Sequence, residues 1–244
     1  MLLNGFAVGC DPDTRKLIDK TSIKPGQILI GCQETSFRAN GFTLIRKILE
    51  NQFGKDYHTK LKHEFIRELI APSVIYTPCI GLHLMGDHNE DPRLITDDGN
   101  CAITGVAHIT GQGIPGKCGN MLKGTGYGMF IDNPFDPPSA MLQIQQWGNL
   151  SAEELLITFH SGTGLIFSVE EKYADSALSL IEEYNQSEKE RARQFNEQNP
   201  ECPRLRQRVD ARRIGEIIDT PRIIINNKTA DKKPQPYLEF TIKQ

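Results

Sequence analysis

Residues 107–116 read AHITGQGIPG and contain the spacing G-x-G-x-x-G at Gly111, Gly113 and Gly116. In a dinucleotide-binding fold this spacing joins a strand to a long helix. Here the chain continues KCGNMLKGTGYG, and each glycine inside a helix costs about 1 kcal/mol relative to alanine. We therefore reject the dinucleotide interpretation and expect a short helix that starts near Pro115.

The remaining interpretation is a glycine loop that can bind an anion. Glycines leave successive backbone N–H groups uncovered, and the N-terminus of the following helix adds partial positive charge. Thr110 contributes a hydroxyl donor, and His108 a side chain that titrates near neutral pH. The residues alone leave two alternatives open, namely a phosphate-binding loop and a glycine turn that only permits tight packing.

The composition argues against several classes of function. The 244 residues carry a formal net charge of −3, so no basic surface points to nucleic acid or to an anionic membrane. Hydrophobic residues make up 38 %, which suffices for a buried core, but no apolar run approaches about 18 residues. The six cysteines form no C-x-x-C pair, and no signal peptide is recognisable. We expect a cytoplasmic protein without a nucleic-acid or membrane partner.

The order of the expected elements indicates the fold class. Strands are expected in residues 5–10, 27–32, 101–110, 124–132, 163–170, 212–219, 221–227 and 236–243. Helices are expected in residues 40–54, 73–85, 137–149, 151–162 and 171–198. Asn40 is a candidate N-cap of the first helix, Gly54 its stop, and Ser151 with Glu154 forms a capping-box pattern. Because no regular βαβ period appears, we predict an α+β fold with a mixed sheet packed with helices.

Several segments resemble, in the same order, the aminoimidazole ribonucleotide synthetase family (phosphoribosylformylglycinamidine cyclo-ligase, PurM-like). GVAHITGQGIPG (105–116) resembles the family's M-A-H-I-T-G-G-G, and residues 23–49 resemble its stretch ending H-S-N-G-Y-S-L-V-R-K. APSVIYTPCI (71–80) resembles A-P-T-x-I-Y, residues 150–169 resemble a segment with T-F-N-M-G-I-G-M, and RRIGEII (212–218) resembles I-G-E-V. The HITGQG form argues against other members of the wider superfamily, such as hydrogenase-maturation or thiamine-phosphate kinase-like proteins.

The resemblance implies ATP-dependent ring closure of formylglycinamidine ribonucleotide to aminoimidazole ribonucleotide, a step of purine biosynthesis. It implies a PurM-like C-terminal domain over residues 33–225, followed by a C-terminal strand and tail over 226–244. Residues 1–32 would be a two-strand remnant of the family's N-terminal ATP-binding and dimerisation domain. ATP and Mg²⁺ are the implied cofactors, but most residues of the family that bind them have no counterpart in this chain.

Because most of the family's ATP- and Mg²⁺-binding residues have no counterpart here, three functions stay open. The chain could supply the substrate-side domain of the enzyme, as a homodimer or with a separate N-terminal-domain chain. It could instead be a ribose-phosphate-binding module that performs no chemistry, or a structural or regulatory subunit that pairs through exposed strands.

The loop and the resemblance together single out one candidate catalytic residue, His108. The expected substrate-binding residues are Arg38, Asn40, Gly41, Thr110, Gly111, Gln112 and Gly113. Asn40 could orient substrate or cap its helix. No metal ligand is expected, because the histidines and acids of residues 83–91 fit no known ligand spacing.

The chain departs from the family pattern in three motifs. R-A-N-G (38–41) replaces H-S-N-G, T-G-Q-G (110–113) replaces T-G-G-G, and H-S-G-T-G (160–164) replaces N-M-G-I-G. Arg38 can bind a phosphate or carboxylate through two hydrogen bonds, whereas Gln112 places a Cβ where the family has glycine. Either these changes tune the ligand preference or they mark a loss of function. For His160 we favour a structural role near a helix C-terminus.

Overall fold

The computed structural model describes residues 17–86, 90–202, 208–229 and 236–242. Seven strands in this part of the chain form one sheet, in the order β2-β4-β1-β5-β3-β6-β7. Neighbouring strands are antiparallel except for β3 and β6, which are parallel. The strands are β1 (Ile28–Gln33), β2 (Ile103–His108), β3 (Gly128–Ile131), β4 (Thr163–Val169), β5 (Ala211–Ile218), β6 (Arg222–Asn226) and β7 (Tyr237–Thr241). The predicted α+β class with a mixed sheet is confirmed.

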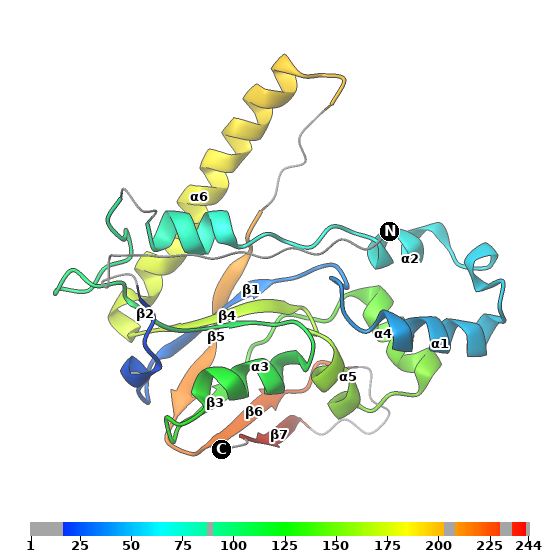
Figure 1. Ribbon diagram of the computed structural model, residues 1–244, viewed down its shortest axis with the longest axis horizontal. Helices are drawn as coiled ribbons and strands as arrows, with labels where there is room; N and C mark the ends of the chain where they lie inside the picture. Colours follow the sequence, from blue (N-terminus) through cyan, green and yellow to red (C-terminus); the bar gives the residue numbers. More distant parts are fainter. Residues whose placement is uncertain (1–16, 87–89, 203–207, 230–235, 243–244) are drawn as a thin grey trace.

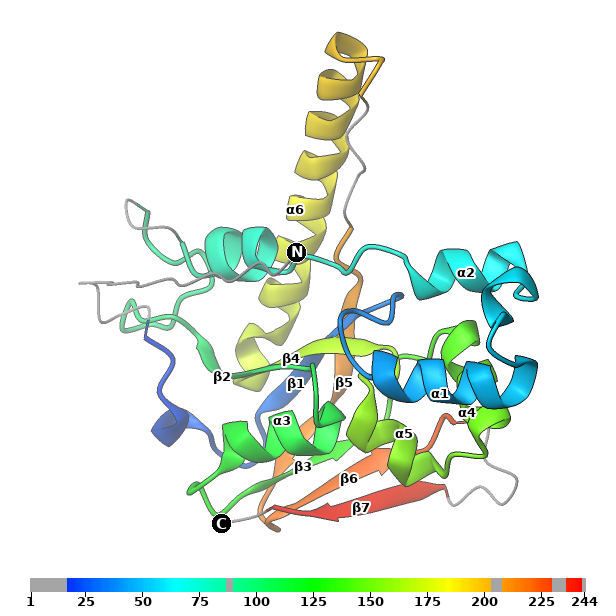
Figure 2. The same cartoon turned by 45° about the vertical axis from the view of Figure 1, so that its right-hand side comes forward.

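Helices cover both faces of the sheet (Figure 1). The α-helices are α1 (Phe42–Phe53), α2 (His63–Leu69), α3 (Gly113–Leu122), α4 (Ser139–Gly148), α5 (Ala152–Thr158) and α6 (Glu171–Gln198). A π-helix, η4 (Thr77–Leu84), and two short 3₁₀ turns, η2 (Lys20–Ser22) and η3 (Tyr57–Thr59), complete the described helices. Helices α3 and α5 lie on one face, and η4 and α6 lie on the other; the C-terminal half of α6 extends beyond the sheet (Figures 1 and 2).

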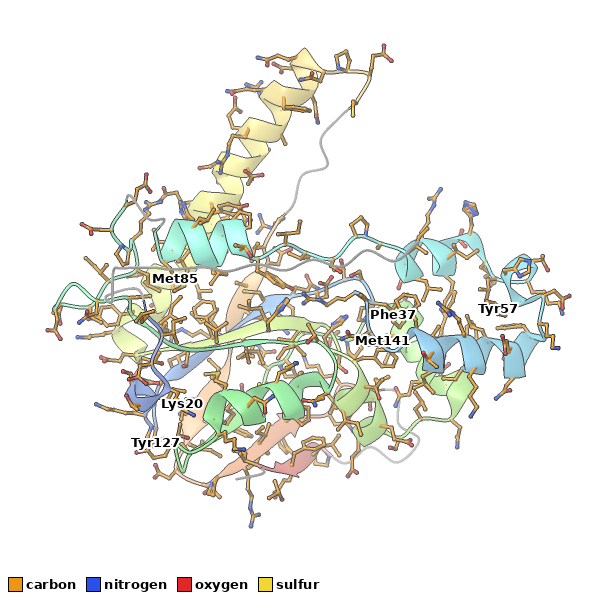
Figure 3. The ribbon with its side chains drawn as sticks, viewed as in Figure 1. Lys20, Phe37, Tyr57, Met85, Tyr127 and Met141 are labelled. Carbon is orange, nitrogen blue, oxygen red and sulfur yellow. The ribbon has the colours of Figure 1, made fainter. Side chains whose placement is uncertain are left out.

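Strand β4 shows why helices pack on both faces of the sheet. All seven of its residues are buried, and successive side chains of a strand point to opposite faces. Ile166 joins the core beneath α3 and α5, whereas Leu165 and Phe167 join the core beneath η4 and α6. A third cluster holds α1, α2 and α4 together beside the sheet, and it includes Phe37 and Met141, which are labelled in Figure 3. The sheet is therefore an internal layer.

Strand β1 lies inside this sheet, third in the strand order. It is hydrogen-bonded to β4 on one edge and to β5 on the other, and Leu29 and Ile30 are fully buried on opposite faces. Strand β1 therefore shares a core with the strands after it, and the expected division of the chain at residue 32 stays a prediction. The other expected remnant strand, in residues 5–10, lies outside the described residues.

The C-terminal segment also belongs to this sheet. Strand β7 pairs with β6 from Arg222 opposite Thr241 to Asn226 opposite Tyr237. The expected strand of the tail is therefore the last strand at one edge of the sheet, and all three strands expected after residue 211 are present.

Helix α1 ends as predicted but starts differently. Its C-cap is Gly54, yet its N-cap is Gly41, which has φ +70° and makes no side-chain capping bond. A Cβ on Gly41 would lie 2.4 Å from Cε1 of Phe159, so packing requires glycine at this turn. The proposed capping role of Asn40 is therefore wrong; its Nδ2 is buried and has no hydrogen-bond partner among the described residues.

The predicted capping box of α5 is confirmed. Ser151 Oγ accepts a 3.1 Å hydrogen bond from the backbone N–H of Glu154, and a Glu154 carboxylate oxygen accepts a 2.8 Å bond from the N–H of Ser151. Within the described ranges, no helix is both long enough and apolar enough to span a bilayer.

Candidate functional site

The glycine loop connects the end of β2 to the start of α3. Gln112 and Gly113 both adopt left-handed backbone conformations, with φ of +76° and +58°. The N–H of Gly113 donates a 3.0 Å hydrogen bond to the carbonyl of Thr110, which closes the turn. A Cβ on Gly113 would lie 1.7 Å from the carbonyl oxygen of Leu156, so only glycine fits there. Gly113 thus shapes the loop, and its N–H is not free to bind a ligand.

The exposed donors of the loop come from the three residues before Gly113. Within the described part of the chain, nothing accepts a hydrogen bond from the N–H of Gly111, the N–H of Gln112 or the hydroxyl of Thr110. Gly111 and Gln112 are exposed, and no atom lies within 4 Å of the position that a Gly111 Cβ would occupy. Two free amides and one hydroxyl at a helix N-terminus form a donor set suited to an anion.

Arg38 and His108, 70 residues apart in the sequence, are in direct contact. Nη2 of Arg38 donates to Nε2 of His108, and Nη1 of Arg38 donates a 3.1 Å hydrogen bond to the carbonyl of Gly164. The same carbonyl accepts a 2.9 Å bond from the N–H of Ile109. The loop containing Arg38 and the end of β2 are thus joined through Gly164.

Sequence reasoning missed two residues that hold Arg38 in place. The buried carboxylate of Glu34 lies 3.7 Å from Nε of Arg38 and accepts hydrogen bonds from both the N–H and the hydroxyl of Ser36. The guanidinium carbon of Arg38 lies 5.6 Å from the ring centroid of Tyr76. A carboxylate at the end of an apolar strand, four residues before an arginine, was the available signal for Glu34; Tyr76 is distant in sequence and offered none.

His108 is neutral in this arrangement. Arginine can only donate hydrogen bonds, so Nε2 of His108 must accept and the ring proton resides on Nδ1. Partial burial, together with the nearby charges of Arg38 and Lys117, holds the pKa of His108 below its usual value. His108 therefore presents one N–H donor in a locally positive field.

His160 has a structural environment, as we favoured from the sequence. Its ring is fully buried; Nε2 donates a 2.5 Å hydrogen bond to the carbonyl of Ser36, and Nδ1 accepts a 3.1 Å bond from the N–H of Gly162. Burial lowers the pKa of His160 to about 4. The helix dipole does not keep this side chain charged, because one ring nitrogen donates and the other accepts a hydrogen bond, which requires the neutral imidazole.

The departures from the family pattern coincide with unusual backbone geometry. Four described residues other than glycine have positive φ, and three of them are Arg38, Gln112 and Ser161. The fourth, Asn149, forms the left-handed C-cap of α4, where asparagine is common. Left-handed conformations of larger residues are sparsely populated and occur often at functional sites.

The structure accommodates Gln112 through a second glycine. A Cβ on Gly116 would lie 2.4 Å from Cβ of Gln112, so the glycine one turn into α3 leaves room for the glutamine side chain. Ser161 is less well satisfied, because its buried hydroxyl has no partner among the described residues.

The described residues contain no group of three or more His, Cys, Asp or Glu side chains arranged to hold a metal ion. Residues 87–89, part of the segment whose ligand spacing we weighed, lie outside the described residues.

The comparisons with known proteins identify a family for this chain. The family described as "AIR synthase related protein, C-terminal domain" matches residues 24–189. The phosphoribosylformylglycinamidine cyclo-ligase of Geotalea uraniireducens is 33% identical over 185 residues, which cover 75% of this chain and 49% of the relative. The protein of the same name from Thermodesulfovibrio yellowstonii is 31% identical over 183 residues, covering 73% of this chain and 49% of that protein.

Solved structures show a more distant likeness. A HypE–HypF complex aligns with a TM-score of 0.46 and 16% identity, over 85% of this chain and 51% of that one. The chain spans about half the length of the curated relatives that it matches. The family match covers more than half of the chain and includes β1, the glycine loop and the segment of Arg38. This chain therefore belongs to the AIR synthase related family, and the matching part is the C-terminal domain of that family.

Proposed function

We propose that this chain provides the substrate-side domain for ATP-dependent ring closure of formylglycinamidine ribonucleotide to aminoimidazole ribonucleotide. The observation that carries the proposal is the set of free donors at the start of α3, namely the two exposed amides and the Thr110 hydroxyl. The relatives named phosphoribosylformylglycinamidine cyclo-ligase supply the reaction class.

The ribose phosphate of the substrate would bind at these donors. Phosphate oxygens accept hydrogen bonds from amides at a helix N-terminus, where the partial positive charge of the helix adds to the attraction. Anchoring this remote part of the substrate fixes the position of its reacting end, and binding energy can thereby lower the barrier of the chemical step. Thr110, Gly111 and Gln112 are the proposed phosphate ligands.

His108 would act on the part of the substrate next to the phosphate. Its Nδ1–H can donate a hydrogen bond, and the contact with Arg38 fixes which ring nitrogen carries the proton. Arg38 is held by Gly164 and Glu34, so it acts mainly on the position and protonation of His108. Asn40 and Gly41 lie in the same segment as Arg38, and their proposed role is to shape this side of the site.

ATP and Mg²⁺ are implied by the family, but the described residues do not form a site that fits the metal ion. When bound, ATP would activate the formyl amide oxygen by phosphorylation. No described residue is assigned a contact with ATP or Mg²⁺. The nucleotide-binding half would come from a separate chain or from an attached domain, since the relatives are about twice as long as the matched region.

The test is a cyclisation assay combined with a binding measurement. Formation of aminoimidazole ribonucleotide is followed with this chain alone and with the added N-terminal half of the Geotalea uraniireducens relative. Affinity for ribose 5-phosphate is measured by calorimetry on this chain alone, for the wild type and for Thr110→Val. The proposal predicts turnover only in the mixture, and binding that weakens about tenfold when the hydroxyl is removed.

Two other results separate the alternatives. Binding at the loop without turnover in the mixture would favour a ribose-phosphate-binding module, which the substitutions at Arg38, Gln112 and Ser161 make a reasonable second candidate. Absence of saturable ribose 5-phosphate binding would contradict both functions.

A further inference from the structure

A cavity of about 480 Å³ lies next to the Arg38–His108 pair. It is bounded by η4 and by the segment that precedes η4. Its walls are mostly apolar and include Val74, Ile80 and Leu165. This volume is in the range of small-molecule sites, which are typically apolar with a few converging polar groups. The loop donors Thr110, Gly111 and Gln112 do not line it, but Arg38 and His108 do, so the cavity adjoins the proposed ring-closure site through this pair.

The charges around the cavity favour an anion. Among the described residues that line it, Arg38 carries the only formal charge, and none is a carboxylate. The Arg38 side chain is only 9% exposed, and its guanidinium has five N–H groups. Gly164 and His108 each accept from one of them and Glu34 lies near a third, which leaves two N–H groups without these partners.

The polar end of the cavity is also rigidly built. Arg38 adopts a left-handed backbone conformation with φ +56°, which is strained for a residue other than glycine and persists only where the surrounding structure holds it. Glu34, which faces Arg38, is itself held by Ser36 and by a 3.2 Å bond from the N–H of Val74. Other titratable groups near the cavity end are His108, which is neutral, Lys117, whose charge acts on His108, and Tyr76, whose hydroxyl donates a 2.7 Å bond to the carbonyl of Gln33. The structure thus holds the Arg38 guanidinium, paired on one side with the Glu34 carboxylate, at the end of an apolar cavity.

We propose that this cavity binds a small monoanion with an apolar body, such as an aryl carboxylate, with the carboxylate on Arg38 and the body between η4 and Leu165. The ring-closure substrate is polar throughout, so this ligand would be a second one that binds beside the phosphate loop. The cavity shares Arg38 and His108 with the proposed ring-closure site, but binding of this ligand is measured without any turnover.

The test uses 2-naphthoate as the probe and its uncharged counterpart 2-naphthylmethanol as the ligand control, both measured by calorimetry and NMR with the full chain. Gly81 lines the cavity on η4, and a Cβ there would meet only Cγ2 of Thr77, at 3.4 Å. Gly81→Phe therefore fills the cavity without a backbone penalty. Gly119→Phe is the matched control, because Gly119 is also a helical glycine, has no atom within 4 Å of its Cβ position and lies outside the cavity lining.

We expect 2-naphthoate to bind at least tenfold more tightly than 2-naphthylmethanol, because only the former makes charge-assisted hydrogen bonds. Gly81→Phe should weaken 2-naphthoate binding at least tenfold, and Gly119→Phe should change it less than twofold. Ribose 5-phosphate affinity should change less than twofold in both variants, so failure of the loop site and failure of the cavity can be told apart. Equal affinity for the two probes, equal effects of the two variants, or no binding at millimolar 2-naphthoate would overturn the proposal.

Discussion

Lowering the pH from 7.5 to 5.0 should destabilise this protein through His160. Burial holds the pKa of this side chain at about 4 in the folded protein, against an ordinary value of 6.5. As the pH falls below 6.5, the unfolded chain takes up a proton that the folded protein still excludes. The free energy of unfolding must therefore decrease across this window. Protonation of Nδ1 would also place a donor against the N–H of Gly162.

The expected magnitude follows from the two pKa values. The full difference corresponds to about 3 kcal/mol, of which about 2 kcal/mol should be lost by pH 5.0. The assay is urea unfolding at both pH values, followed by the fluorescence of Trp147, the single tryptophan, which packs against Phe53 and Phe65.

His160→Asn is the matched variant, because it removes the titrating ring and introduces the residue of the resembled family motif. His83 and His108 also have lowered pKa values, so both proteins should share a smaller slope of the same sign. We predict that the wild type loses about 2 kcal/mol more than the variant between the two pH values. Identical pH dependence in the two proteins would refute the reasoning.

Four further substitutions test the loop and the cap of α5 by urea unfolding. Gly113→Ala should lower the free energy of unfolding by more than about 2 kcal/mol, because the new Cβ would collide with the carbonyl of Leu156. Gly111→Ala should change it by less than about 0.5 kcal/mol, because there is open space around Gly111. Similar effects of the two substitutions would argue against this loop geometry. Ser151→Ala should cost about 1 kcal/mol through loss of the cap, and a neutral result would contradict the capping box. Gln112→Gly should raise the free energy of unfolding by about 0.5–1 kcal/mol, since it relieves a left-handed residue; destabilisation would show that the glutamine side chain makes a compensating contact.

Local patterns in the sequence were sufficient for much of the fold. The capping box at Ser151 is a short-range device, and hydrophobic periodicity located most of the described helices and strands within a few residues, although α2 was not expected. The glycine loop could be foreseen for the same reason, because unobstructed amides at a helix start depend only on consecutive residues.

Features that depend on distant partners could not be foreseen. Ile28 pairs with Val169 and with Glu216, and nothing local in β1 reveals that it lies between those strands. Gly41 takes the N-cap position that Asn40 was expected to fill, because Phe159 leaves no room for a side chain there. A capping preference of about 1 kcal/mol is readily overridden by such a contact.

In the candidate site, too, local features could be predicted from the sequence and contacts between distant segments could not. His108 and Thr110 followed from one motif, whereas the partners of Arg38 come from three separate segments. Glu34 directly follows β1, Gly164 lies on β4, and Tyr76 immediately precedes η4. Only the folded chain shows that Arg38 fixes the protonation state of His108.

The central claim is that free backbone donors of the glycine loop bind the phosphate of a ribonucleotide. The most direct measurement is a ¹H–¹⁵N NMR titration of the chain with ribose 5-phosphate, with ribose as the control ligand. We predict saturable downfield shifts of the Gly111 and Gln112 amide protons with the phosphate and none with ribose. Unchanged signals from these two amides at saturating ribose 5-phosphate, or equal shifts with ribose, would contradict the claim.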